Sequence, residues 1–198
     1  KLPAARRDDG QLLGDSQRIV EHLARLHRDP LGEAGWTTTE RATAKAFRAL
    51  FETDLYFTGV YGRWVPEANW AQFKPAMATS IGQMGVPGLV LPLVLKQVRK
   101  TMLKQLHSQG TGRWSPEQVA EHGIGGYSAV ADFLGSKPYM LGDKPSALDA
   151  TAFGFLHTLL VPPFSTPVKD YVASQTHLVA YHHRMLAAYE AKAGLLRN

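Results

Sequence analysis

The stretch YMLGDKPSALDA, residues 139–150, decides the fold of the helical part of this 198-residue chain. Ser146 can cap a helix whose third residue is Asp149, and each side chain can then satisfy the other residue's backbone N–H. Pro145 prevents a helix from entering from the preceding loop. Residues 150–160 are nearly all apolar, which predicts a central helix. Ser146 and Asp149 are therefore predicted to have a structural role, and losing this capping box would cost about 1–2 kcal/mol.

Helical spacing of apolar residues continues on both sides of this stretch. Thr37 and Glu40 can form a second capping box, which opens a long helix that is expected to run to about residue 61. The spacing of its apolar residues predicts a buried stripe made of Ala44, Phe47, Phe51, Leu55 and Thr58. Other helices are predicted at 15–27, 67–79, 91–106, 115–134 and 176–193.

Residues 8–23, DDGQLLGDSQRIVEHL, indicate the end of a different structural unit. Asp9 and Gly10 favour a hairpin turn between two short strands. An amphipathic helix follows, and either Asp15 or Ser16 can cap it. The start of a helix also attracts anions, because it presents free N–H groups and the positive end of the dipole. Capping alone accounts for both residues, and a carboxylate-binding site is the alternative interpretation.

Composition limits the classes of function. The chain has no cysteine, so it has no disulfide framework and no cysteine nucleophile within these residues. This fits a reducing compartment, and we expect a cytoplasmic protein. The net charge is +5, but lysine and arginine are scattered among acidic residues, so no nucleic-acid partner is expected. The eight histidines lack the spacing of zinc ligands, and no nucleophile-elbow pattern of a hydrolase is present. We expect no metal.

Two surface features leave alternatives open. The apolar run at residues 85–95 is shorter than the roughly 20 residues that cross a bilayer. It is interpreted as the start of a buried helix, with a docking surface for a membrane or partner as the alternative. A basic stripe follows and is interpreted as a solvated helix face or, alternatively, a surface that attracts anions or a partner. Its members are Lys96, Arg99, Lys100, Lys104 and His107.

The two ends of the chain together resemble glutathione transferases. Leu2-Pro3, the turn at residues 9–10 and Asp15-Ser16 before an amphipathic helix are similar to the last third of their thioredoxin-like domain. Ser146-x-x-Asp149 resembles the capping box in the core helix of their all-helical C-terminal domain. Three further segments resemble the subgroup of failed axon connections proteins and, more distantly, metaxins. They are GTGRWS at 110–115, Leu134-Gly135 and residues 139–150.

The resemblance covers essentially the whole chain and implies a mainly α fold. Residues 1–30 would be the C-terminal remnant of a thioredoxin-like, glutathione-binding α/β domain, ending in a hairpin and a helix. Residues 36–198 would be the all-helical C-terminal domain. A βαβ unit needs about 30 residues, and none of it is present before the hairpin. We therefore expect a longer protein, with its catalytic Tyr, Ser or Cys upstream of Lys1.

The resemblance also implies roles for four residues of a glutathione site. Pro3 would be a cis-proline, which costs only about 0.5–1 kcal/mol, and Leu2 would offer backbone groups to the cysteinyl part of glutathione. Ser16 would bind the γ-glutamyl carboxylate, and Asp15 would bind the ammonium group. Many family members have glutamine or glutamate at the position of Asp15, so the aspartate is a mild departure.

An electrophile would lie between the domains, against the long helix that starts at Thr37. Tyr56, Tyr61 and Trp64 are candidates to line that pocket, and core or interface aromatics are the alternative interpretation. The implied activity is transfer of glutathione, as co-substrate, to a small electrophile by a homodimer. A non-catalytic binding or scaffold protein of the same fold is the main alternative. A membrane-associated adaptor is a weaker alternative, and we expect no membrane association.

Overall fold

The structure is a computed structural model that describes residues 4–27, 29 and 33–195, with side chains to residue 191. Leu2 and Pro3 therefore lie outside the described residues. Strand β1 (Ala4–Arg6) pairs antiparallel with β2 (Leu12–Gly14), with Ala5 opposite Leu13. The turn between them includes Gly10, whose φ of +82° favours glycine. This confirms the predicted hairpin.

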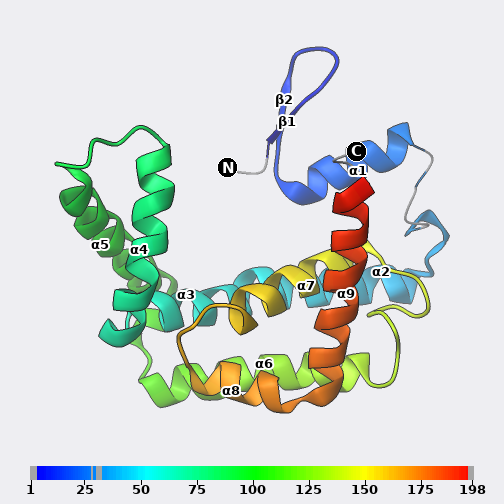
Figure 1. Cartoon of the computed structure of the whole chain (residues 1–198). Helices are drawn as coiled ribbons and strands as arrows, with labels where there is room; N and C mark the ends of the chain where they lie inside the picture. Colours follow the sequence, from blue (N-terminus) through cyan, green and yellow to red (C-terminus); the bar gives the residue numbers. More distant parts are fainter. Residues whose placement is uncertain (1–3, 28, 30–32, 196–198) are drawn as a thin grey trace.

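Helix α1 (Ser16–Leu26) follows the hairpin and lies beside it, to one side of the other helices (Figure 1). Its predicted apolar face is present, but none of its residues is buried. Leu23 and Leu26 are 43% and 56% exposed. The other described residues therefore leave the apolar face of α1 largely uncovered.

The long helix predicted from Thr37 is present in three contiguous pieces. They are α2 (Thr38–Ala49), the π-helical segment η2 (Leu50–Leu55) and α3 (Tyr56–Trp64). At its start, Glu40 accepts a hydrogen bond from the backbone N–H of Thr37 at 2.7 Å, and the Thr37 hydroxyl accepts one from the N–H of Glu40 at 3.2 Å. The predicted stripe faces the core, where Phe51 and Leu55 are fully buried. The π-helical turn was not predicted, because the spacing of the apolar residues does not distinguish it from an α-helix.

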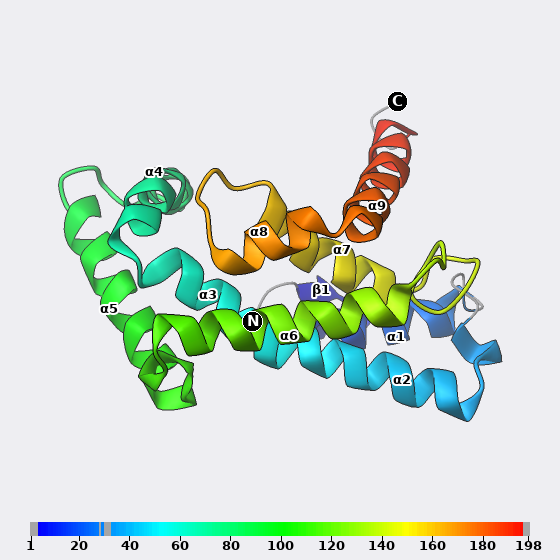
Figure 2. The same cartoon turned by 90° about the horizontal axis from the view of Figure 1, so that it is seen from below.

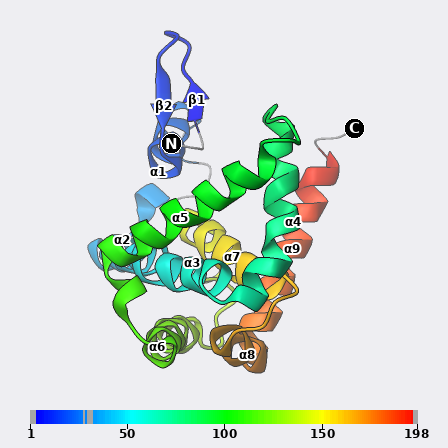
Figure 3. The ribbon, with the colours of Figure 1, turned by 90° about the vertical axis from the view of Figure 1, so that its left-hand side faces the viewer.

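The remaining helices follow the predicted order, with two differences. Helices α4 (Glu67–Gln83) and α5 (Leu91–Gln109) form an arm at one end of the molecule (Figures 1 and 3). Helix α4 runs one turn beyond its predicted end because Ile81 in that turn is buried. Helix α8 (Pro167–Ser174) was not predicted. Thr166 caps this helix, because its hydroxyl accepts a hydrogen bond from the N–H of Lys169 at 3.1 Å. Pro167 occupies the first helical position.

Helices α6 (Pro116–Leu134), α7 (Ala147–Leu160) and α9 (Thr176–Leu195) complete the main body, with short 3-10 turns η1 (Glu33–Gly35) and η3 (Thr111–Arg113). Seen from below, α6 runs along the α2–α3 helix (Figure 2). The two pack closely because Gly126 has no side chain. A Cβ at this position would lie 2.7 Å from Cδ2 of Leu55. One hydrophobic cluster joins α2, η2 and α6–α9, and a second joins α3 to α4 and α5.

The start of α7 is built around the fully buried carboxylate of Asp149. It accepts hydrogen bonds from the N–H of Ser146 at 2.9 Å and from the Ser146 hydroxyl at 2.7 Å. It also accepts from the N–H of Met140 at 2.8 Å and from the hydroxyl of Tyr181 at 2.8 Å. The predicted capping box is thus present, and it is extended by donors from the preceding loop and from α9. A second carboxylate, that of Glu33, accepts from the N–H of Ala147 at 2.7 Å.

We expect Asp149→Ala to lower the free energy of unfolding by about 3 kcal/mol or more. It removes the carboxylate acceptor of two buried N–H groups and two buried hydroxyls, at about 1–3 kcal/mol for each group left unpaired. Urea denaturation followed by circular dichroism measures this loss. The matched control is Asp132→Ala in α6, because Asp132 is exposed and surface changes stay within about 0.5 kcal/mol. Equal stability of the two variants would contradict the role of Asp149.

A buried histidine predicts that stability falls in mild acid. His182 is 4% exposed, its Nε2 lies 3.1 Å from Nδ1 of His157, and its own Nδ1 has no hydrogen-bond partner among the described residues. Burial and the nearby His157 and His183 lower its pKa. The imidazole of His182 therefore binds a proton more readily in the unfolded chain than in the folded chain. The free energy of unfolding is fully present above about pH 6.5 and decreases as the pH falls through the lowered pKa.

We therefore expect His182→Gln to flatten the dependence of unfolding free energy on pH between neutral and mildly acidic conditions. Urea titrations at a series of pH values test this. His107→Gln, which changes an exposed histidine of α5, should keep the wild-type slope. A wild-type slope in His182→Gln would show that other groups cause the acid sensitivity.

Candidate functional site

The start of α1 is shaped by Asp15. Its backbone has φ 82° and ψ 125°, a conformation that residues other than glycine rarely adopt. Its Oδ1 accepts hydrogen bonds from the N–H of Gln17 at 3.0 Å and of Arg18 at 3.4 Å. Asp15 rather than Ser16 is therefore the cap. A strained backbone of this kind costs about 1–3 kcal/mol and persists only where surrounding contacts hold it.

Ser16 occupies the first position of α1, beside this carboxylate. Its side chain is exposed, and its hydroxyl makes no hydrogen bond with another described residue. The positive end of the α1 dipole lies at the same place. The arrangement thus presents a carboxylate and an available hydroxyl next to each other at an electropositive helix start. The contacts expected from Leu2 and Pro3 fall outside the described residues and stay predictions.

A polar hollow of about 530 Å³ lies between α1 and α2. It includes Gln17, the residue after Ser16. Charges of both signs line it, from Glu21 on α1 to Arg41, Lys45 and Glu52 on the long helix. Ser16 itself is not among its lining residues, so the hollow neighbours the expected carboxylate contact without containing it.

The three aromatic residues expected at an electrophile pocket do not surround one cavity. An α-helix advances about 100° per residue, so α3 points Tyr56 well away from Tyr61, whereas Tyr61 and Trp64 share one side and belong to one core cluster. Tyr56 is 41% exposed and packs edge-on against Phe57, with ring centres 5.0 Å apart. Trp64 is buried and stacks on Trp70 at 5.0 Å. Tyr61 alone of the three lines the larger cavity described next.

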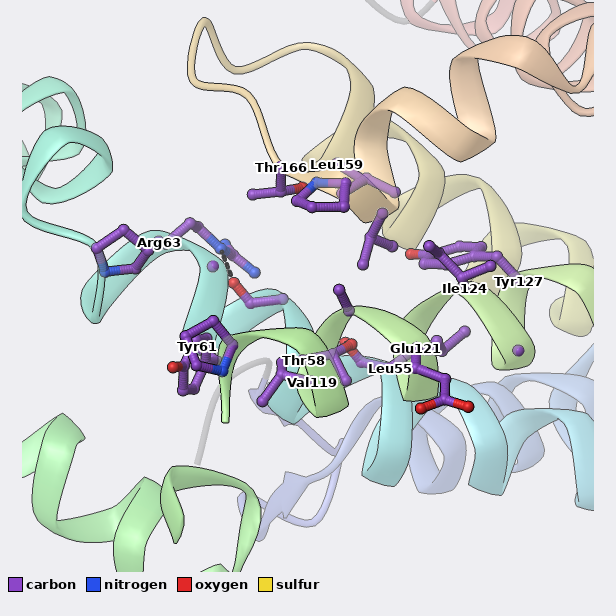
Figure 4. A pocket seen from close by; sticks show the side chains of 18 of the residues that line it. Leu55, Thr58, Tyr61, Arg63, Val119, Glu121, Ile124, Tyr127, Leu159 and Thr166 are labelled. Carbon is purple, nitrogen blue, oxygen red and sulfur yellow. Dashed lines mark hydrogen bonds between the residues drawn. The ribbon is translucent and has the colours of Figure 1, made fainter. Parts of the chain in front are cut away.

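This larger cavity, of about 730 Å³, lies among α3, α6, α7 and α8 (Figure 4). Its walls are mainly apolar, with Leu55, Ile124, Phe155 and Leu159 among them. Arg63 and Tyr127 bring polar groups to it. We did not single out either residue from the sequence. A usable signal is present for Arg63, which is the only charged residue in the apolar segment VYGRWV at 60–65.

The described part of the chain shows two further features relevant to function. It contains no group of three or more His, Cys, Asp or Glu side chains that could hold a metal ion. No helix within it combines the length and apolar character needed to cross a membrane. Both statements concern only the residues for which the structure gives positions.

Comparison with known proteins assigns the chain to a family. The model of the glutathione S-transferase N-terminal domain matches residues 1–69, and that of the C-terminal domain matches residues 124–185. Isoprene-epoxide–glutathione S-transferase of Rhodococcus sp. (strain AD45) is 33% identical over 191 residues, which cover 96% of this chain and 78% of that protein.

Two more distant relatives carry different names. Failed axon connections of Drosophila melanogaster is 27% identical over 185 residues, or 89% of this chain and 44% of that protein. Metaxin-2 of Homo sapiens is 24% identical over 156 residues, or 78% of this chain and 58% of that protein. The chain thus spans about half the length of these two proteins. No solved structure gives a significant match. The mainly α architecture, the domain matches and the 33% identity together show that this chain belongs to the glutathione S-transferase family.

Proposed function

We propose that the protein binds glutathione at the start of α1 and transfers it to a small electrophile, with epoxides as the preferred class. The adjacent carboxylate and hydroxyl of Asp15 and Ser16 at the positive end of a helix carry this proposal. They suit a ligand end that has an ammonium group and a carboxylate side by side. The activity named for the relative from Rhodococcus supports the choice of an epoxide.

In this proposal, each residue has a separate task. Ser16 donates its hydroxyl to the γ-glutamyl carboxylate, and the α1 dipole adds to the attraction. Asp15 attracts the ammonium group while its Oδ1 holds the first turn of the helix. Leu2, the residue before Pro3, offers its backbone groups to the cysteinyl part. The strained backbone of Asp15 fixes the direction of its side chain before the ligand arrives, which reduces the ordering cost of binding.

The reaction that follows is a nucleophilic substitution. The glutathione thiolate attacks an epoxide carbon, an S–C bond forms, the C–O bond breaks, and the alkoxide takes a proton. A group that favours the thiolate raises the rate, because the thiolate is the nucleophile. We assign that group to no residue of this chain. Tyr56, exposed on α3, is our candidate contact for the electrophile, and we also propose a cytoplasmic homodimer.

A non-catalytic glutathione transferase-fold protein is the second candidate. It is favoured by the similarity to failed axon connections and metaxin-2, neither of which carries an enzymatic reaction in its name. Such a protein would use the same surfaces to bind a ligand or a partner without turnover. Binding and turnover must therefore be measured separately.

Calorimetric titration with glutathione tests the binding site. We expect Ser16→Ala and Asp15→Asn each to weaken binding about ten-fold or more, because a hydrogen bond to a charged group contributes about 1.5–3 kcal/mol. Asparagine can keep both the cap and the positive φ of Asp15, so this variant removes mainly the charge. Hydrogen exchange of the α1 amides checks that the helix remains formed in both variants.

The control is Asp8→Asn, which changes an exposed carboxylate at the hairpin turn and should bind glutathione like the wild type. Unchanged affinity in Ser16→Ala and Asp15→Asn would refute the assigned site. Initial rates with glutathione and isoprene monoepoxide then separate the two candidates. Turnover supports the transferase, whereas tight binding without turnover supports the non-catalytic protein.

A further inference from the structure

The 730 Å³ cavity next to α3 is separate from the proposed glutathione site. Its lining begins at Leu55, so neither the hairpin nor α1 contributes a residue. In Figure 3, α3 lies between the α4–α5 arm and the pair α6 and α8. The cavity occupies the side of α3 that faces α6 and α8. Its volume falls within the roughly 300–1,000 Å³ of typical small-molecule sites.

Arg63 brings a cation into this apolar space without a matching anion. Its Nε donates to the backbone carbonyl of Gly59 at 3.0 Å. No described carboxylate lies within ion-pair distance of its guanidinium group. Burial lowers the pKa of Arg63, yet an arginine stays charged in proteins. A partly desolvated guanidinium that still has free N–H groups is a site for an anion.

Tyr127 adds a second donor at the same cavity. The residue is 3% exposed, and its hydroxyl forms no hydrogen bond with another described residue. Burial raises the pKa of Tyr127 well above its ordinary value, so the hydroxyl keeps its proton and can donate. Figure 4 shows the Tyr127 ring and the Arg63 side chain extending into the same space from α6 and α3. A ligand oxygen in the cavity would accept hydrogen bonds from both groups.

Two glutamates on α6 limit the charge of that ligand. Glu117 and Glu121 line the cavity as exposed side chains, and neither forms an ion pair with Arg63. Their negative charges oppose a ligand with several anionic groups. The remaining wall is largely apolar, with Leu55, Val119, Ile124, Phe155 and Leu159. These features suit one acidic group joined to an apolar body.

We propose that this cavity binds a monocarboxylate with an aliphatic or aromatic body, such as a medium-chain fatty acid. The carboxylate accepts hydrogen bonds from Arg63 and Tyr127, and the apolar body lies along the wall formed by α6 and α7. The ligand is thus a second small molecule, distinct from glutathione. This inference does not depend on the proposed transferase activity.

Calorimetric titrations with octanoate and with octanol test the proposal on the wild-type protein. The two probes share the apolar chain and differ in charge. We expect octanoate to bind about ten-fold or more tightly than octanol, because only the carboxylate can form charge-assisted bonds with Arg63. The octanoate affinity should stay the same in saturating glutathione and in Ser16→Ala. Equal affinity for both probes, or no binding of octanoate, would overturn the proposal.

Variants then locate the contact. Arg63→Met keeps an apolar side chain of similar length, and it should weaken octanoate about ten-fold while leaving octanol binding unchanged. Tyr127→Phe removes only the hydroxyl and should weaken octanoate by a smaller factor. Glu121→Gln should not weaken octanoate, because it removes a like charge at the cavity. Octanoate affinity that is unaffected by Arg63→Met would contradict this site even if the wild type binds octanoate.

Discussion

The buried carboxylate of Asp149 is the interaction on which the helical part of the molecule depends. A carboxylate without water is costly unless hydrogen bonds replace its hydration. Here Met140 in the loop before α7, the cap residue Ser146 and the hydroxyl of Tyr181 on α9 all supply donors to it. Three segments must therefore come together for the charge to be satisfied. Helix α7 also brings Phe155 and Leu159 to the large cavity, so the same carboxylate positions a wall of that site.

Local signals were sufficient for most of the fold. Thr37 and Ser146 were recognised as helix starts because each has an acidic residue three positions later that can complete a capping box. Such a pattern can be seen directly in the sequence. The π-helical turn at η2, the added turn of α4 and the presence of α8 were missed. The added turn of α4 depends on packing between elements, as the burial of Ile81 shows, and intrinsic preferences do not contain that information. Helix α8 does have a local signal, the cap Thr166 followed by Pro167.

The candidate sites also combine features that the sequence predicted with features that only the structure reveals. A cap at residue 15 or 16 was predictable, but the choice of Asp15 depends on its unusual φ, which no spacing reveals. Tyr56, Tyr61 and Trp64 are close in sequence, yet α3 leaves Tyr56 exposed and buries Tyr61 and Trp64 in a core cluster. Arg63 and Tyr127 belong to helices that are distant in sequence, and only the packing of α3 against α6 opens a cavity between them. Membership of the glutathione S-transferase family does not specify that cavity, because function depends on the site and not on the fold alone.

Native-state hydrogen exchange of the Met140 amide tests the central claim most directly. This N–H donates to Asp149 from outside any helix, so its protection reports whether the carboxylate holds the loop as firmly as the core. We expect it to exchange only through global unfolding, with the same free energy as the slowest amides of α7. Exchange through a local opening that costs several kcal/mol less would show that the loop moves independently, and that Asp149 does not organise the domain.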